Sequence, residues 1–334
     1  MFIVCGVLGA VDCDYFAYFH CDAGRYFDRN IDPMNPSAPV LLSLLAALYL
    51  TRAAASEASV AFLGPKASYS DEAATAYASR ADITGTTPLT TITEIAQFVR
   101  DSRVQFGVLP FENSIGGFVA ETHRLLLAPQ DPGWRVIADV TISISNNLLV
   151  KPGTRASDLR KVVSHPEALK ECASWLKANF PQLPREDVSS TAAAAEAVSK
   201  SDGTVAAIAS SAAARVYQLQ VLFPNIQDDQ HNATNFLVIQ AAGRDFPEQN
   251  PTRLIVGLDV AQGADTLTRL LEALRHLSFA LTSVDSAPSG TLGSYRFALI
   301  LDSTCGANLI QIQTTLRPTG AALIGAYRRS SIAP

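Results

Sequence analysis

Small hydrogen-bonding side chains gather directly before a buried strand in the segment IQDDQHNATNFLVIQ, residues 226–240. His231, Asn232, Thr234 and Asn235 precede FLVIQ, which has the apolar pattern of a buried strand. Amides and hydroxyls can bind a carboxylate or donate a hydrogen bond to a departing oxygen. The tripeptide Asn232-Ala-Thr234 is also a glycosylation sequon, which has meaning only in a secreted chain.

Four further loops of similar composition stand at predicted strand ends, namely GPKASYS (64–70), LPFENSIGG (109–117), SHPEAL (164–169) and SST (189–191). Backbone N–H groups at the helix starts in such loops can bind anions. Taken singly, Ser70 and Ser190 are equally well explained as helix caps, and His165 as a residue that closes a strand–helix junction. The chain has no G-x-S-x-G elbow, H-E-x-x-H motif or Gly-rich phosphate loop. Together the five loops predict a polar cage for a carboxylate ligand.

Composition excludes several classes of function. The chain has 334 residues, 48% of them hydrophobic and 17% charged, which is typical of a globular protein. Its net charge of −5 and lack of a basic block argue against a nucleic-acid surface. The longest apolar run, residues 39–50, is shorter than the roughly 20 residues of a membrane span. The five cysteines contain no C-x-x-C pair, which argues against a metal site and favours a reducing, cytoplasmic location. Cys172 fits the apolar face of a helix.

Residues 1–58 differ in composition from the rest of the chain. They hold Cys5, Cys13, Cys21 and the aromatic cluster YFAYFHCDAGRYF. The apolar run at 39–50 could serve as the core of a secretion signal, but no basic segment precedes it. We therefore expect a poorly structured extension, and we expect the remaining chain to fold and act without it.

From Ser59 onward strands alternate with helices, which predicts an α/β unit over residues 59–243 with a largely parallel sheet. The expected strands include 59–64, 106–111, 161–164 and 203–210, and the expected helices include 70–80, 91–101, 165–180 and 190–200. After the linker PEQNPT, residues 252–328 follow the order β-α-β-β-α-β of a ferredoxin-like unit.

Six stretches of the first unit resemble the prephenate dehydratase family: FLGPKASYSDEAA, GVLPFENSIGG, VVSHPEALKEC, SSTAAAAEAV, AAIASSAAARVYQL and IQDDQHNATNFLVI. Their order and spacing match throughout. The resemblance implies a two-lobed catalytic domain like a type 2 periplasmic binding protein, followed by an ACT regulatory domain. It also implies a cofactor-free lyase, without a metal, that converts prephenate to phenylpyruvate, water and CO2 in phenylalanine biosynthesis.

The resemblance also assigns roles to individual residues. Thr234 matches the Thr of the family's Thr-Arg-Phe motif, and would donate to the leaving hydroxyl. Phe236 matches the aromatic of that motif. In the ENS loop, Glu112 would orient the loop, while Asn113 and Ser114 would take part in catalysis and hold the substrate. The other implied substrate-binding residues are Ser68, Tyr69, Ser70, His165, Thr191 and Asn235.

Asn235 stands where the family has Arg, and it can supply neither charge nor bidentate bonds. This departure leaves two alternatives open: a prephenate decarboxylase that does not aromatise its product, and an inactive ligand-binding or regulatory homologue. It also predicts that Asn235→Arg raises dehydratase activity. Whether arogenate is accepted stays open.

The C-terminal resemblance is weaker. The family's effector segments read GADTL and DSAP here, so Gly263, Ala264, Asp285 and Ser286 are the candidate effector residues. Ala287 stands where the family has Arg, so we expect phenylalanine to be at most a weak effector. The resemblance implies a homodimer or homotetramer.

Overall fold

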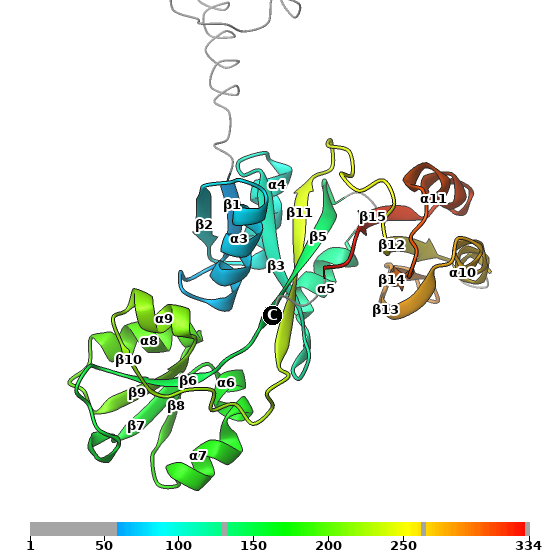
Figure 1. The fold of residues 1–334 in the computed structure, drawn as a ribbon. Coiled ribbons are helices and arrows are strands. Elements are labelled where there is room, and N and C mark those ends of the chain that lie inside the picture. Colours follow the sequence, from blue (N-terminus) through cyan, green and yellow to red (C-terminus); the bar gives the residue numbers. More distant parts are fainter. Residues whose placement is uncertain (1–58, 129–131, 262–264, 331–334) are drawn as a thin grey trace, which may run out of the picture. The chain divides into compact units, whose positions relative to one another are not determined.

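The computed structural model describes residues 59–128, 132–261 and 265–330 (Figure 1). The predictions for the extension at 1–58, and for Gly263 and Ala264, lie outside these residues. Within the described part, strands and helices form a mixed α/β fold with two sheets, so the predicted fold class is confirmed.

The first sheet has ten strands in the described residues: β1 (Ser59–Leu63), β2 (Gly85–Leu89), β3 (Phe106–Asn113), β4 (Gly117–Phe118), β5 (Trp134–Ser143), β11 (Ala233–Ala241), β12 (Arg253–Val260), β13 (Ala280–Pro288), β14 (Tyr295–Asp302) and β15 (Ala322–Tyr327). Their order is β13-β14-β12-β15-β5-β11-β3-β1-β2, with β4 paired to β3. The second sheet has the order β10-β6-β9-β7-β8 and comprises β6 (Asn147–Val150), β7 (Lys161–Ser164), β8 (Arg185–Asp187), β9 (Val205–Ala209) and β10 (Gln220–Phe223).

The expected parallel pairing holds where helices connect the strands. β1 pairs in parallel with β2 and β3, and β7 pairs in parallel with β8 and β9. The pairing of β11 differs from this pattern, because β11 is antiparallel to both β3 and β5. The chain leaves the first sheet at the end of β5 and returns at the start of β11, where Ser143 faces Ala233. A strand that returns beside the exit point must run in the opposite direction.

The helices of the described chain are α3 (Tyr69–Arg80), α4 (Ile92–Arg100), α5 (Ala120–Leu126), α6 (Pro166–Glu171), α7 (Ala173–Asn179), α8 (Thr191–Ser199), α9 (Ser211–Val216), α10 (Thr266–His276) and α11 (Leu309–Leu316), with 3-10 turns at Ala156–Asp158 and Arg317–Thr319. Two of them differ from the prediction. The N-cap of α3 is Ser68, whose Oγ accepts from the Asp71 N–H, and Ser70 lies inside the helix. The helix expected at 165–180 is broken at Cys172, where φ is −109° and ψ is 13°.

Successive side chains of β1 point to opposite faces of the first sheet, and a different helix covers each face. Val60 and Phe62 of β1 face one side, where α3 presents alanines, and Ala61 faces the other side with Ile95 of α4. All of these side chains are fully buried, and each buried Val, Ile or Phe contributes roughly 1.5–3 kcal/mol. Cys172 is also fully buried, as predicted, in the core of the second sheet. Each sheet therefore has a packed hydrophobic core, which fixes the ends of the strands and helices from which the loops extend.

The C-terminal unit runs β12-α10-β13-β14-α11-β15, with the antiparallel strand order β13-β14-β12-β15. This is the arrangement that the β-α-β-β-α-β pattern predicted. Its four strands are continuous with the other strands of the first sheet through a parallel contact between Gly325 of β15 and Val136 of β5. A Cβ added at Gly325 would lie 3.0 Å from the Val136 Cβ and 3.2 Å from the Ile255 Cβ, so glycine permits this close approach.

Candidate functional site

A cavity of about 490 Å³ brings together all five of the loops singled out in the sequence. Each loop contributes at least one lining residue. The lining comprises Leu63, Gly64, Ser68, Tyr69, Ser70, Asn113, Gly116, Gly117, Phe118, Val119, Ile144, Asn146, His165, Glu167, Ala168, Glu171, Ser189, Ser190, Thr191 and Thr234. Both sheets therefore supply walls of a single cavity, and most of the polar groups on those walls are uncharged.

Asn113 fixes the hydroxyl of Thr234 on this wall. The Asn113 Oδ1 accepts the backbone N–H groups of Ile115 at 2.9 Å and of Gly116 at 2.7 Å. Its Nδ2 must therefore face the other way, and it donates to Thr234 Oγ1 at 3.0 Å. A hydroxyl oxygen that accepts this bond keeps its own proton for another acceptor. Thr234 is thus set up to donate a hydrogen bond.

Ser114 and Asn232 hold the loops behind Thr234. The Ala233 N–H donates to Ser114 Oγ at 3.0 Å, and the Ser114 N–H donates to the Ala233 carbonyl at 2.9 Å. Asn232 Oδ1 accepts from Asn113 Nδ2 at 2.7 Å. Asn232 is only 1% exposed, so its side chain is inaccessible to a glycan. Ser114 lies outside the cavity lining and connects the loops instead.

Two longer helices begin at the cavity. Ser68 caps α3, and Ser190 caps α8 by accepting from the Ala193 N–H, as predicted for Ser190. Ser70 is the second residue of α3, and Thr191 is the first residue of α8. Both line the cavity, and their hydroxyls make no hydrogen bond with the described residues. Helix N-termini carry a partial positive charge, so this wall can bind carboxylates. His165 also lines the cavity, and its Nδ1 accepts from the Glu167 N–H at 3.3 Å.

A partly buried network connects Tyr69, a predicted substrate-binding residue, through Asn146 to Glu171, and the sequence analysis missed the last two residues. The Tyr69 hydroxyl donates to the Ser145 carbonyl at 2.9 Å and lies 3.3 Å from Asn146 Oδ1. Asn146 Nδ2 then donates to Glu171 Oε2 at 2.8 Å. Burial raises the pKa of Tyr69 well above its ordinary value, so its hydroxyl stays protonated and acts as a donor. All three side chains line the cavity.

The remaining predicted residues lie elsewhere. Glu112 is exposed on β3, and Phe236 is 2% exposed within the core of the first sheet. Neither belongs to the cavity lining, and Asn235 does not belong to it either. Direct contact of these side chains with a ligand in the cavity therefore has no support from this geometry.

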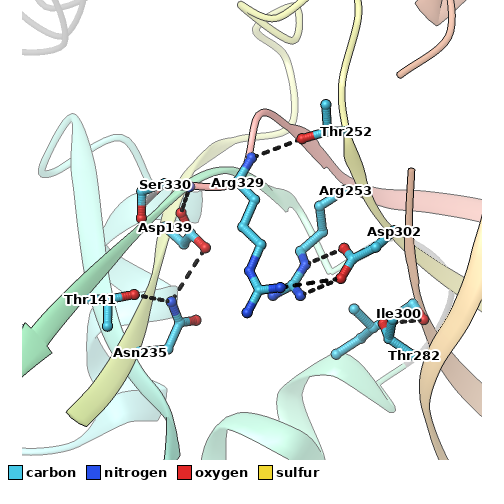
Figure 2. A network of polar contacts seen from close by, with 10 residues as sticks. All are labelled: Asp139, Thr141, Asn235, Thr252, Arg253, Thr282, Ile300, Asp302, Arg329 and Ser330. Atoms are coloured by element: carbon cyan, nitrogen blue, oxygen red, sulfur yellow. Dashed lines mark hydrogen bonds and ion pairs between the residues drawn. The ribbon is translucent and has the colours of Figure 1, made fainter. Parts of the chain in front are cut away.

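Asn235 instead connects β11 to β5 (Figure 2). Its Nδ2 donates to Thr141 Oγ1 at 3.0 Å and lies 3.3 Å from Asp139 Oδ2. The other Asp139 oxygen accepts from the backbone N–H of Ser330 at 2.7 Å. Figure 2 also shows Arg329, the neighbour of Ser330, beside the partly buried ion pair of Arg253 and Asp302. Nη1 of Arg329 lies 3.6 Å from Oδ2 of Asp302. Position 235 thus helps to hold the C-terminal segment on β5.

Asp285, a candidate effector residue on β13, contacts α5 of the first unit. Asp285 Oδ2 lies 2.8 Å from Nδ1 of His123 on α5. The His123 ring is stacked on Phe111, and its centroid lies 4.2 Å from that of Phe118, which lines the cavity. The Ser286 N–H donates to Asp285 Oδ1 at 2.7 Å. A chain of direct contacts therefore runs from the DSAP segment to the cavity wall.

These observations agree with the comparisons with known proteins. A family model described as prephenate dehydratase matches residues 60–244, more than half of the chain. The chain therefore belongs to the prephenate dehydratase family. It is 33% identical over 245 residues to the bifunctional chorismate mutase/prephenate dehydratase of Pseudomonas aeruginosa, covering 73% of this chain and 64% of that relative's length.

Two solved structures share the fold. The prephenate dehydratase of Arthrobacter aurescens in complex with L-Phe has a TM-score of 0.71 at 24% identity, covering 83% of this chain and 93% of that one. GqqA, a quorum-quenching acylase, has a TM-score of 0.69 at 24% identity, covering 81% and 98%. Because one fold occurs in proteins with different described activities, the activity must be argued from the site.

Among residues 59–128, 132–261 and 265–330, none of the helices combines the length and the hydrophobicity that a membrane span requires. The same residues contain no cluster of three or more His, Cys, Asp or Glu side chains that could hold a metal ion.

Proposed function

We propose that this chain converts prephenate to phenylpyruvate, water and CO2. The observation that carries the proposal is the 3.0 Å hydrogen bond from Asn113 Nδ2 to Thr234 Oγ1 inside the cavity. This bond leaves the Thr234 proton to be donated to the hydroxyl that departs from the ring. Hydroxide is a poor leaving group, so a donor held in place at that oxygen lowers the barrier directly.

The atoms and charges of the reaction balance without a nucleophile. The ring carboxylate leaves as CO2, and its bonding electrons complete the aromatic ring while the ring C–O bond breaks. The departing hydroxide takes one proton and becomes water. A Thr hydroxyl is too weak an acid to supply that proton alone, so Thr234 passes on a proton from water in a hydrogen-bonded relay.

The helix starts of α3 and α8 would bind the substrate's carboxylates through their N–H groups and through Ser70 and Thr191. These groups are neutral donors. They hold the ring carboxylate without the strong stabilisation that an ion pair with Lys or Arg would give, which would slow its loss as CO2.

Thr234→Val tests this role, because it removes the hydroxyl and preserves the branched shape. We expect kcat for phenylpyruvate formation to fall by on the order of a hundredfold or more, with substrate binding changed only a few fold. Product analysis by mass separates the alternatives. A non-aromatic decarboxylated product from the unmodified chain would favour the decarboxylase, and retained binding without any product would favour an inactive homologue.

For regulation, we propose that the C-terminal unit is an ACT domain that responds only weakly to phenylalanine. Asp285 is engaged by His123, and Ala287 offers no charged group to a bound amino acid. The solved relative from Arthrobacter aurescens is a complex with L-Phe, so phenylalanine is the effector to test. Strong inhibition at micromolar phenylalanine would contradict this proposal.

A further inference from the structure

A second cavity lies where the C-terminal unit meets β5, and we call it the junction cavity. It has a volume of about 280 Å³, and its walls come from β5, β15, α11 and the segment after β11. None of its lining residues belongs to the cavity that contains Thr234. Its walls are apolar apart from the side chains of Arg135 and Gln313. The junction cavity is therefore separate from the candidate active site and has one cationic group.

The charge of Arg135 is not compensated within the described residues. The guanidinium carbon lies 5.1 Å from the centroid of the Phe246 ring, which covers one face of the group. The half-buried guanidinium makes no ion pair and no hydrogen bond with the part of the chain that the structure describes. Its N–H donors lie in the plane of the group, and their fork geometry matches a carboxylate. Arg135 is thus available to bind an anion.

An adjoining cavity adds a second positive charge. It has a volume of about 320 Å³, shares Gln313 and Leu323 with the junction cavity, and is also lined by Arg317. Arg317 has no ion pair with a described residue either. Neither cavity has an Asp or a Glu among its described lining residues. A surface hollow with charges of one sign raises the local concentration of ligands of the opposite sign.

We propose that the junction cavity binds a small aromatic carboxylate that carries no ammonium group. The carboxylate pairs with the in-plane N–H groups of Arg135. The ring packs on Leu323 and on the edges of Trp134 and Phe246, where edge-to-face contact is favourable. An amino acid binds less well, because its ammonium group is repelled by Arg135 and finds no carboxylate partner. The volume, just below the roughly 300–1,000 Å³ of sites for drug-sized ligands, suits a molecule with a single ring.

Phenylpyruvate belongs to this class of ligand. If the chain forms it, the product has a second binding place away from Thr234. That identification rests on the proposed function, whereas the class of ligand rests on the lining of the junction cavity alone. The test therefore measures binding without turnover, so that the two proposals can fail separately.

Trp134 provides a local signal for the test. The chain has two tryptophans, and the other, Trp175, packs beside Phe180 at the core of the second sheet. In the full chain with Trp175→Phe, the fluorescence of Trp134 is measured during titration with 3-phenylpropanoate. We expect a saturable change. Phenylalanine, which adds an ammonium group, and 3-phenylpropan-1-ol, which lacks the carboxylate, should bind at least about tenfold more weakly.

Four variants in this background make the assignment specific. Arg135→Gln removes the charge and should raise Kd for 3-phenylpropanoate by roughly tenfold to a hundredfold, while Arg135→Lys should recover part of the loss. Arg275→Gln makes the same charge change on the exposed face of α10 and should leave Kd unchanged. Ala322→Leu fills the cavity but keeps the guanidinium, and should also weaken binding.

Several results would overturn the inference. These are the absence of a saturable signal, equal affinity for phenylalanine and 3-phenylpropanoate, and equal effects of Arg135→Gln and Arg275→Gln. Urea unfolding shows whether each variant is folded. If Arg135→Gln does not fold, Ala322→Leu decides the question, and unchanged affinity in that variant overturns the inference. The expected pattern of binding supports it even if the chain consumes no prephenate, in which case only the proposed function fails.

Discussion

Asn113→Asp should abolish most of the dehydration while leaving the fold intact. The new carboxylate keeps an oxygen for the N–H groups of Ile115 and Gly116, which Asn113 Oδ1 now accepts at 2.9 and 2.7 Å. Its other oxygen replaces the amide donor that faces Thr234. The Thr234 hydroxyl must then donate to residue 113, so its proton is withdrawn from the leaving group. Loss of one transition-state donor costs about 10²–10³ in kcat, or about 2.7–4 kcal/mol.

The cost in stability should be much smaller. Asn232 Oδ1 lies 2.7 Å from Asn113 Nδ2 and would oppose the new oxygen. The Asn232 Nδ2, however, is buried without a hydrogen-bond partner, so rotation of this amide brings a donor to residue 113. We expect the free energy of unfolding, measured with urea, to change by less than about 1 kcal/mol.

A double-mutant cycle with Thr234→Val distinguishes this mechanism from a general effect of the added charge. If Asn113 acts through the Thr234 hydroxyl, the double variant loses little more kcat than either single variant. The assay is phenylpyruvate formation at saturating prephenate. Retention of kcat within about tenfold in Asn113→Asp, or losses that simply add, would refute the assigned role of the Asn113–Thr234 bond.

Three other predictions follow from the described contacts. Asn235→Arg should place a guanidinium against Asp139, outside the cavity. The free energy of unfolding, measured with urea, should therefore rise by about 1 kcal/mol while kcat stays nearly unchanged; a large gain in kcat would instead support the prediction from the sequence that this substitution raises dehydratase activity. A cycle of His123→Gln and Asp285→Asn should give a coupling energy of about 1 kcal/mol, because Asp285 is 40% exposed and the pair is partly screened; zero coupling would remove the link between β13 and α5. Burial raises the pKa of Glu72, so the folded state favours its protonated form and the ionised form opposes folding at neutral pH. Glu72→Gln should therefore be more stable than the parent at pH 7, and this difference should shrink as the pH falls through the raised pKa of Glu72 and be largely gone at about 4, near the ordinary pKa of a Glu; a constant difference down to that pH would contradict the assignment.

The sequence predicted the loops of the cavity well because their signals are local. Each loop joins a buried strand to a polar segment rich in Gly, Ser or Asn, and strand ends in α/β sheets meet at common edges. The cap of α3 was predicted at Ser70, which directly precedes the acidic residues of the first turn, and this prediction was wrong by two residues. The structure uses Ser68, whose extended backbone, with φ −81° and ψ 166°, precedes the helix.

The residues that sequence reasoning missed or misplaced depend on long-range contacts. Asn146 lies in the segment that passes between the sheets, and Glu171 lies at the end of α6; the sequence analysis singled out neither residue. Only the packing of α6 against that segment brings their side chains within 2.8 Å. For Asn235 a signal was available, because adjacent residues of a strand point to opposite faces, and Thr234 already faces the cavity. Asn235 was nevertheless predicted to bind substrate, because it stands at the Arg position of the Thr-Arg-Phe motif.

The most direct test of the central claim is to mix the unmodified chain with prephenate and to measure phenylpyruvate and CO2 together. We expect both products to form in equal amounts, and we expect Thr234→Val to slow their formation by on the order of a hundredfold or more. CO2 without phenylpyruvate, or equal rates in the two proteins, would contradict it.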